Sequence, residues 1–321
     1  MQERLDTPLI SIIIVNYNGL HFLEPCLSSI LNQTFKKFEI VFVENGSSDD
    51  SAGFVREHYP SVKIVKTGKN LGFAGGINAG IRIAQGEFIL TLNNDTIVDP
   101  HFLEELQKPF LQDPRMGMCG SKMVLPDGRI NSTALCISRS GAAWDRGMGE
   151  PDHGQYDVAE EIFGPSAGAA LYRRPMLDEI GLFDEDFFLF FEDVDLAFRA
   201  RLAGWKCMYV PTARVVHIRG GTANPGSDSA VYYGNRNTIW YVVKNFPTRI
   251  FALSLPWILG RNCAVITYYF LSGKFLTIIR AKIDAIKGFP LMIGKRRCIN
   301  KNVQSRTIEK WIQTWSRVPK T

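Results

Sequence analysis

A run of acids follows a run of aromatic residues between positions 187 and 199, FFLFFEDVDLAFR. An ionised carboxylate beside so much apolar surface loses hydration and needs a compensating partner. A helix that begins near Glu192 would put Asp193 in its first turn, where the helix dipole favours negative charge while aromatic neighbours raise the pKa of the carboxyl group. Such opposed influences can leave an acid ionised yet basic enough to accept a proton. Asp193 is therefore a candidate general base; the alternative is that Glu192 and Asp193 only complement the start of the helix.

The same stretch also contains a pair of charges with a structural explanation. Asp195 and Arg199 are spaced four residues apart with the acid first, which is the favoured orientation for an ion pair on one helix face. Such a pair stabilises an exposed helix by only about 0.2–0.5 kcal/mol. Stabilisation of the helix by the Asp195–Arg199 pair is at least as good an interpretation as contact of these residues with a substrate. The residues from Phe187 to Phe191 are expected to form part of the core and the wall of an acceptor pocket.

The elements that must position these acids come earlier in the chain. Apolar runs within residues 10–18, 38–51, 62–68 and 87–95 are typical of buried strands, and the segments between them carry helix signals. This alternation predicts an α/β fold with a mostly parallel central sheet and helices on both faces. Asn16, Glu44 and Asp95 stand at strand ends, and the carboxyl ends of such strands meet at one ligand-binding crevice.

A glycine-rich loop, NLGFAGGINAG at residues 70–80, follows the third strand. It does not match the G-x-G-x-x-G pattern of dinucleotide-binding proteins, which would follow the first strand. Its glycines allow a phosphate or a sugar to approach the backbone at a helix start. The alternative is that Gly75 and Gly76 only permit close packing.

Eight segments taken together resemble the inverting glycosyltransferases of family 2, which have the GT-A (Rossmann-like) fold, and in particular their rhamnosyltransferase-like branch. The resemblance covers about residues 9–240 and implies transfer of a sugar from a nucleoside diphosphate sugar, dTDP-rhamnose or a UDP-sugar, to a hydroxyl of a glycan or lipid-linked acceptor. The matching segments are IIIVNYNG, VENGSSDDS, NLGFAGGINAGI, LNND, GAALYRR, GLFDEDFFLFFEDVDLAFRARLAGW, VPTARVVH and YYGNRN.

The resemblance also implies roles for individual residues. It makes Asp193 the general base that deprotonates the acceptor hydroxyl, and it implies acceptor contacts for Gly168, Asp184, Glu192 and Arg236. Glu44 stands where the family usually has Asp. The donor and its nucleotide are implied to bind Asn16, Asn18, Glu44, Asn45, Asn70, Gly72, Phe73, Ala74, Asn78, Asn94 and Asp95.

A divalent cation, Mg²⁺ or Mn²⁺, is implied at the segment LNND. The D-x-D motif of the family has become Asn93-Asn94-Asp95 here, so only its last acid is present. Asp95 and His217 are the implied metal ligands, and a hard cation of this kind binds one or two carboxylates together with phosphate oxygens. By itself, a His at a strand end is more often structural.

The C-terminal part of the chain is basic and apolar. Residues 244–321 contain 15 Lys and Arg against 2 Asp and Glu, a net charge of +13, whereas residues 1–243 carry 22 against 30, a net charge of −8. Such a split favours an anionic partner, and no nucleic-acid-binding motif accompanies it. We therefore expect a catalytic domain over 1–245 and a helical extension over 246–321 that contacts an anionic membrane surface.

How that extension meets a membrane is left open by the sequence. In residues 250–271, 16 of 22 residues are hydrophobic, a length that would suit a membrane span. Pro256, Gly260 and Arg261 lie near its centre, and a central Arg costs about 2.5–3.5 kcal/mol on insertion scales. Helices lying in the interface are favoured over a re-entrant hairpin. An ordinary pair of buried helices is the third possibility.

The cysteines are scattered, and the first residues show no signal-peptide pattern, which favours a cytoplasmic protein bound to the inner face of the membrane. Two rival functions remain for such a sequence. A sugar nucleotidyltransferase would have a Gly-rich loop with Arg or Lys after the first strand, where NYNGLHFLE has no cation. A non-catalytic, membrane-bound nucleotide-sugar binder is harder to distinguish, because Asn93 already replaces one acid.

Overall fold

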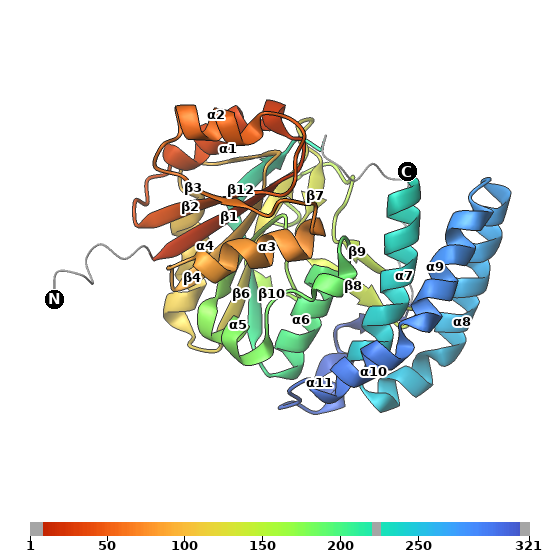
Figure 1. Ribbon diagram of the computed structural model, residues 1–321. Helices are drawn as coiled ribbons and strands as arrows, with labels where there is room; N and C mark the ends of the chain where they lie inside the picture. Colours follow the sequence, from red (N-terminus) through yellow and green to blue (C-terminus); the bar gives the residue numbers. More distant parts are fainter. Residues whose placement is uncertain (1–8, 220–225, 315–321) are drawn as a thin grey trace.

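Four parallel strands form the N-terminal half of the central sheet. A computed structural model describes residues 9–219 and 226–314. Its strands β1 (Ile10–Asn16), β2 (Phe38–Glu44), β3 (Lys63–Lys66) and β4 (Phe88–Asn93) lie in the order β4-β1-β2-β3, all parallel. Each falls inside one of the predicted apolar runs, so this half of the sheet is confirmed. Figure 1 shows the sheet with helices on its two faces.

Alternating side chains divide the core between the two faces of this sheet. In β1, Ile12 and Ile14 pack toward α1 (Leu20–Leu31), α2 (Ser51–His58) and α4 (Phe102–Gln112), whereas Ile13 packs toward α3 (Gly72–Ile83). Continuous apolar sequence is what a strand covered on both faces requires. The cluster on the α3 face continues into α5 (Arg174–Ile180) and α6 (Glu192–Leu202).

The other half of the sheet is mixed. Strand β11 (Ala169–Arg173) is antiparallel to both β4 and β6 (Met116–Val124), while β12 (Lys206–His217) runs parallel to β6. Shorter strands β5 (Thr96–Val98), β7 (Ile130–Ser132) and β10 (Glu160–Glu161) complete a ten-stranded sheet. The predicted parallel arrangement therefore holds for the first four strands and for β6 with β12. It does not hold for β11, which lies between β4 and β6 and is antiparallel to both.

A small second sheet stands beside the main one. It consists of β8 (Leu135–Ser138), β9 (Ala143–Asp145) and the C-terminal strand β13 (Ile312–Gln313), in the order β13-β8-β9. The C-terminal extension thus returns to the α/β part and supports the hairpin formed by β8 and β9. A short 3-10 helix, η1 (Glu185–Phe187), leads into the phenylalanine-rich loop before α6.

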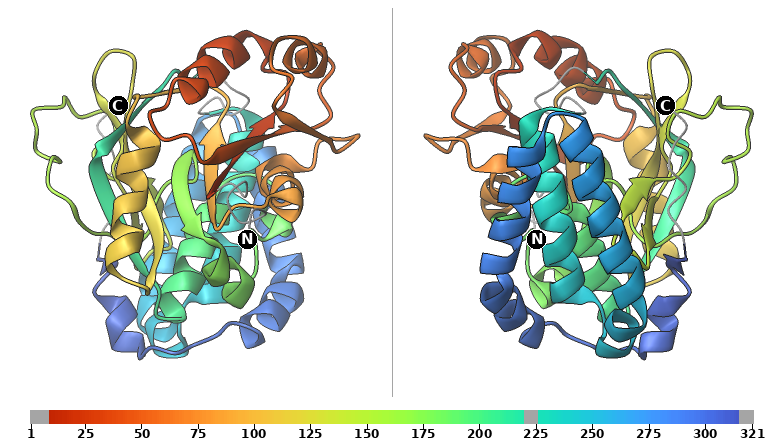
Figure 2. Two further views of the ribbon diagram at one scale, coloured as in Figure 1. Left: turned by 90° about the vertical axis from the view of Figure 1, so that its left-hand side faces the viewer. Right: turned by 90° about the vertical axis from the view of Figure 1, so that its right-hand side faces the viewer.

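The C-terminal helices form a layer against one side of the α/β part (Figures 1 and 2). Helix α7 (Asp228–Asn245) packs on α9 (Phe275–Lys287) and α10 (Phe289–Arg297), and α8 (Thr248–Leu271) packs outside α9; α11 (Ser305–Glu309) follows. Ile250, Ala285 and Met292 join the same hydrophobic cluster as α3 and α6. The extension therefore shares its core with the α/β part.

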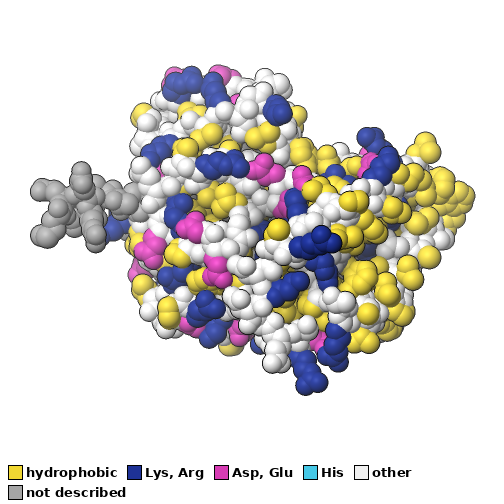
Figure 3. Space-filling model, turned by 60° about the horizontal axis from the view of Figure 1, so that its bottom comes forward, with side chains coloured by type: hydrophobic (Ala, Val, Ile, Leu, Met, Phe, Trp, Pro, Cys, Tyr) yellow, Lys and Arg dark blue, Asp and Glu magenta, His cyan; other side chains and the backbone are white. Residues whose placement is uncertain are grey.

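Helix α8 continues through Pro256 as one element of 24 residues. It is the one helix in the described part of the chain that is long and apolar enough to cross a membrane, and only 11% of its most apolar stretch is buried in the protein. Of the large hydrophobic side chains that are exposed in the described residues, most lie on α8, α9, α10 and the turn between α8 and α9. Figure 3 shows hydrophobic side chains gathered over this end of the molecule.

Candidate active site

A cleft with a volume of about 740 Å³ opens at the carboxyl ends of β1, β2 and β4. Its size is within the usual range for a small-molecule site. Three groups of side chains meet there: the glycine loop, the segment around Asp95 with the end of β12, and the stretch from Phe188 to Val194. The predicted site residues that line it are Asn45, Asn70, Gly72, Phe73, Asn94, Asp95, Gly168, Glu192, Asp193 and His217.

Asn45 organises the glycine-loop end of this cleft. Its Nδ2 donates to the carbonyl of Gly72 at 3.0 Å, and its Oδ1 accepts from the backbone N–H of Leu71 at 3.0 Å. Gly72 has a φ of +73°, and a Cβ there would lie 2.3 Å from the carbonyl oxygen of Phe188. Only glycine can therefore bring this loop against the phenylalanine-rich loop across the cleft.

Five predicted donor residues do not line the cleft. Asn16 is fully buried, and its Oδ1 accepts from Asn94 Nδ2 at 2.6 Å. The other contacts hold neighbouring loops: Asn18 and Glu44 accept hydrogen bonds from the Ser47–Ser48 backbone, and Asn78 donates to the carbonyl of Phe183. The residues that support the cleft without lining it are Asn16, Asn18, Glu44, Ala74 and Asn78.

Asp95 and His217 face each other although they are far apart in sequence. Asp95 Oδ1 lies 3.1 Å from His217 Nε2, because the end of β12 pairs with β5 directly after Asp95. The other ring nitrogen, Nδ1, donates to Asn131 Oδ1 in that amide orientation, which directs Nε2 at Asp95 and the cleft. The sequence predicted the pair but not Asn131, which has the orienting role that carboxylates and carbonyls have beside metal-bound histidines.

These donors fit a divalent cation that is shared with a diphosphate. One buried carboxylate and one imidazole are suitable ligands, and Mg²⁺ or Mn²⁺ would complete its shell with phosphate oxygens and water. Within the described ranges no group of three or more His, Cys, Asp and Glu side chains is placed to hold a metal.

The phenylalanine-rich loop has an unusual backbone. Phe188, Phe190 and Phe191 all have φ values between +62° and +69°, a region that costs bulky residues about 1–3 kcal/mol each. Asn237 holds the loop by donating to three of its carbonyl oxygens at 2.8 Å. Arg236 donates to the carbonyls of Asp186 and Phe187, the second of which it shares with Asn237, so the structure places this predicted acceptor residue beneath the loop and outside the cleft lining.

Asp193 lies in the cleft at the start of α6. Its Oδ1 accepts from the backbone N–H of Val194 at 2.7 Å and its Oδ2 from that of Ala167 at 3.3 Å. Burial, and then the negative charge of Asp145, raise the pKa of Asp193 to about 6. Both oxygens are thus held by donors that favour the carboxylate, yet the group is more basic than a free Asp. This combination suits a general base near neutral pH.

Glu192 lies beside Asp193 and is only 6% exposed. Burial, together with the charge of Asp193, raises the pKa of Glu192 well above its usual value. Its Oε2 has no hydrogen-bond partner among the described residues. An orphaned carboxyl oxygen in a cleft wall is costly unless a ligand satisfies it.

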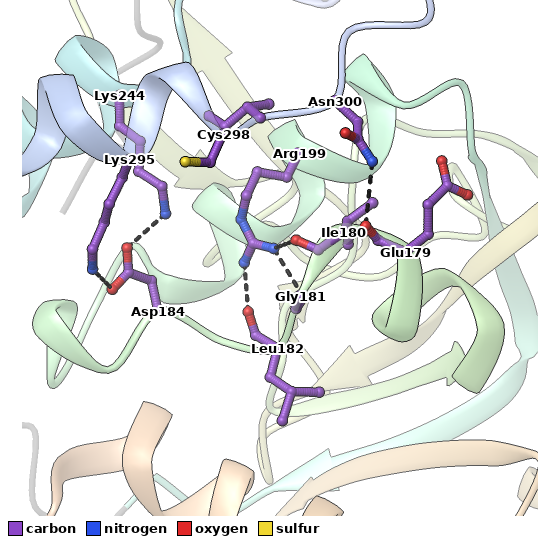
Figure 4. A pocket seen from close by; sticks show the side chains of 11 residues that line it. Glu179, Ile180, Gly181, Leu182, Asp184, Arg199, Lys244, Lys295, Cys298 and Asn300 are labelled. Atoms are coloured by element: carbon purple, nitrogen blue, oxygen red, sulfur yellow. Dashed lines mark hydrogen bonds and ion pairs between the residues drawn. The ribbon is translucent and has the colours of Figure 1, made fainter.

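Asp184 has a different environment from the one the resemblance implied. It lies outside the main cleft, in a smaller pocket of about 290 Å³ beneath α6 (Figure 4). Lys244 Nζ lies 2.6 Å from Asp184 and 2.7 Å from Asp195, and Lys295 also pairs with Asp184. Asp195 is fully buried and bonded to Arg199 at 2.8 Å. The predicted helix pair is therefore part of a buried ion network that joins α6 to α7 and α10.

Several cleft residues gave no signal in the sequence. Asp145 enters from β9, Asn131 from β7, Tyr233 from α7, and Arg219 follows β12. Arg219 is the one Lys or Arg among the described residues that line the cleft, a cation suited to a diphosphate. None of the four stands at the end of a strand in the parallel half, so strand periodicity could not place them together.

Strand ends that carry polar groups, a glycine loop at a helix start and an Asp–His pair define a nucleotide-binding α/β enzyme fold of the GT-A class. Two solved structures have this fold. GalNAc-T7 with UDP, GalNAc and Mn²⁺ superimposes with a TM-score of 0.61 at 17% sequence identity, and the match covers 75% of this chain and 49% of that one. The mannosyltransferase PcManGT of Pyrobaculum calidifontis with GDP-Man and Mn²⁺ superimposes with a TM-score of 0.55 at 17% identity, and the match covers 91% of this chain and 85% of that one. Residues 11–181 match the model of glycosyl transferase family 2, and the chain belongs to this family.

Curated relatives support the same assignment. The chain is 25% identical over 308 residues to the N-acetylglucosaminyl-diphospho-decaprenol L-rhamnosyltransferase of Mycobacterium tuberculosis, covering 88% of this chain and 99% of that protein. It is 27% identical over 221 residues to the O-antigen biosynthesis protein RfbC of Myxococcus xanthus, covering 66% and 17%. The chain is a glycosyltransferase similar to rhamnosyltransferases, as its motifs predicted.

Proposed function

We propose that this enzyme transfers a sugar, with inversion, from a nucleoside diphosphate sugar to a hydroxyl of a lipid-linked glycan. The observation that carries the proposal is the convergence of Asp193, with its raised pKa, and the Asp95–His217 pair in one cleft. Asp193 would accept the proton of the acceptor hydroxyl as its oxygen attacks the anomeric carbon. With a single base and attack from the face opposite the nucleotide, the configuration inverts in one displacement.

The donor end of the cleft fits a nucleoside diphosphate. Asn45, Asn70 and Gly72 would line the nucleotide, and Arg219 would face the diphosphate. Asp95 and His217 would hold Mg²⁺ or Mn²⁺, which would neutralise the charge that develops on the departing diphosphate. dTDP-rhamnose is our first candidate donor, because the mycobacterial relative is a rhamnosyltransferase, and UDP-sugars are the second.

A binding screen followed by a transfer assay tests this proposal. UDP-, dTDP- and GDP-sugars are tested for an increase in Tm with and without Mn²⁺, since a ligand that binds only the native state stabilises it by mass action. The best donor is then incubated with N-acetylglucosaminyl-diphospho-prenol, and the anomeric configuration of the product is determined by NMR. A product of retained configuration, or a protein that binds no nucleotide sugar, contradicts the proposal.

The metal assignment makes its own prediction. Mn²⁺ should increase the UDP-induced rise in Tm of the wild-type protein, and Asp95→Ala should weaken the apparent affinity for Mn²⁺ by at least about tenfold. Asp99→Ala is the matched control, because Asp99 is an exposed acid four residues further along the chain. If Mn²⁺ acts equally on the Asp95→Ala variant, then Asp95 is not a ligand.

The apolar C-terminal helices support a site at a membrane surface. Tyr268, Phe270, Leu271, Phe275 and Leu276 surround the turn between α8 and α9 and are 40–83% exposed. This turn lies next to the start of α7, where Lys274 pairs with Asp228 at 2.9 Å, and the first turns of α7 reach the cleft through Ser229 and Tyr233. A membrane that covers the turn would bring a lipid-linked acceptor to the cleft. We propose that residues 1–245 catalyse and residues 246–321 face the cytoplasmic leaflet.

Replacing two leucines of this turn tests the membrane proposal. Leu271→Glu combined with Leu276→Glu should weaken binding to anionic vesicles by more than about tenfold, since burying each leucine contributes about 1.5–3 kcal/mol. Leu111→Glu is the control, because Leu111 is 77% exposed on α4, in the catalytic part. Co-sedimentation with phosphatidylglycerol vesicles measures both, and unchanged binding by the double variant refutes the proposal.

A further inference from the structure

Asp145 is a third carboxylate in the cleft, and it belongs to neither the metal pair nor the acid pair at the start of α6. It is the last residue of β9 and lines the same cavity as Glu192 and Asp193. It lies near enough to Asp193 that its charge helps to raise the pKa of that residue. Its position is fixed because β9 pairs with β8, which in turn pairs with the C-terminal strand β13.

The two oxygens of this carboxylate are used differently. The Ser132 hydroxyl donates a hydrogen bond to the carboxylate, while Oδ1 has no partner among the described residues. Glu192 Oε2 is in the same situation in the wall of the same cleft, on a side chain that is 94% buried. These two carboxyl groups beside Asp193 fit a ligand that can form several hydrogen bonds.

A sugar ring with adjacent hydroxyl groups has this chemistry, because each hydroxyl can donate to a carboxylate in a short, strong bond. We propose that Asp145 binds a hydroxyl of the acceptor sugar that neighbours the hydroxyl deprotonated by Asp193. Asp145 is then a specificity-determining residue for the acceptor, an inference that depends on the proposed transfer reaction.

Acceptor analogues that lack single hydroxyls test this role. The probes are octyl N-acetylglucosaminide and its 3-, 4- and 6-deoxy forms, whose Kd values are measured by saturation-transfer NMR in the presence of UDP and Mn²⁺. For the wild-type protein, one deoxy form should bind about tenfold more weakly than the parent glycoside. The Asp145→Ala variant should bind the parent glycoside about tenfold more weakly than wild type does. It should bind that deoxy form no more weakly than it binds the parent. The UDP-induced rise in Tm should be unchanged in this variant, which also verifies folding. Asp127→Ala, on an exposed turn, should behave as wild type.

Each other outcome overturns a defined part of the account. If Asp145→Ala binds the parent glycoside as tightly as wild type does, the inference is wrong while the proposed function stands. If Asp145→Ala instead loses the UDP-induced stabilisation, Asp145 belongs to the donor end and the inference is also wrong. If the wild-type protein binds neither octyl N-acetylglucosaminide nor any of its deoxy forms, the sugar acceptor of the proposed function fails and the inference fails with it.

Discussion

Asp193→Asn should lower the rate of sugar transfer by about 10²–10⁴-fold, the usual loss when a general base is removed. The amide keeps the shape of the side chain but cannot take the proton of the acceptor hydroxyl. Donor binding should be retained, because the residues that line the nucleotide end of the cleft come from other elements. Initial rates of transfer, and the increase in Tm with UDP and Mn²⁺, measure the two effects separately.

The control for this variant is Asp178→Asn, an exposed acid on α5, which should keep full activity. An Asp193→Asn enzyme that transfers sugar at the wild-type rate would remove Asp193 from the mechanism. If neither the wild-type protein nor the variant transferred sugar although both bound the donor, the chain would behave as the non-catalytic binder weighed from its sequence.

Lys244→Met should be the most destabilising single change in the ion network beneath α6, with a loss of about 3–5 kcal/mol in the free energy of unfolding. Lys244 is 4% exposed and contacts both Asp184 and Asp195, so its removal leaves two acids buried with less compensation. Urea unfolding monitored by circular dichroism measures the loss. Lys274→Met, which breaks an exposed pair with Asp228, is the control and should cost about 0–1 kcal/mol.

The same network predicts how stability depends on pH. Burial alone would raise the pKa of Asp195, but Lys244 and Arg199 more than offset it and lower the pKa to about 2. A carboxyl group with a depressed pKa contributes stability above its unfolded value of about 3.9, and this contribution is lost as the pH falls toward 2. Lys244→Met should therefore show a smaller loss of stability between pH 5 and pH 2 than wild type. An equal loss would show that the network is not its source.

The sequence predicted the parallel half of the sheet because its strands are buried on both faces and therefore read as continuous apolar runs. The strand ends predicted Asn16, Glu44 and Asp95 in one crevice, and of these three Asp95 lines the cleft; Asn45 and the start of α6, which also line it, came from the family motifs. It could not place Asp145, because β9 is a three-residue strand in a separate sheet whose partner, β13, comes from the far end of the chain. Pairing between segments so far apart in the chain leaves no recognisable pattern in the sequence around either one.

Asp184 and Arg236 illustrate the opposite case. Both stand in motifs that resemble the family, but the side chains point into the protein, one toward lysines from α7 and α10 and the other toward carbonyls of the phenylalanine-rich loop. The left-handed backbone of Phe188, Phe190 and Phe191 explains why such support is needed. No residue type in that run indicates positive φ, since bulky side chains disfavour it. Only the tertiary contacts from Arg236 and Asn237 make it stable.

The pH dependence of kcat/KM tests the role of Asp193 most directly, because this parameter reports the ionisation of the free enzyme. Asp193 must be ionised to accept a proton, and burial together with Asp145 raises its pKa to about 6. We predict that kcat/KM is constant above neutral pH and falls about tenfold per pH unit below about pH 6, and that the residual activity of Asp193→Asn lacks this limb. A wild-type profile that stays flat down to pH 4.5, or a limb that persists in the variant, would contradict the assignment.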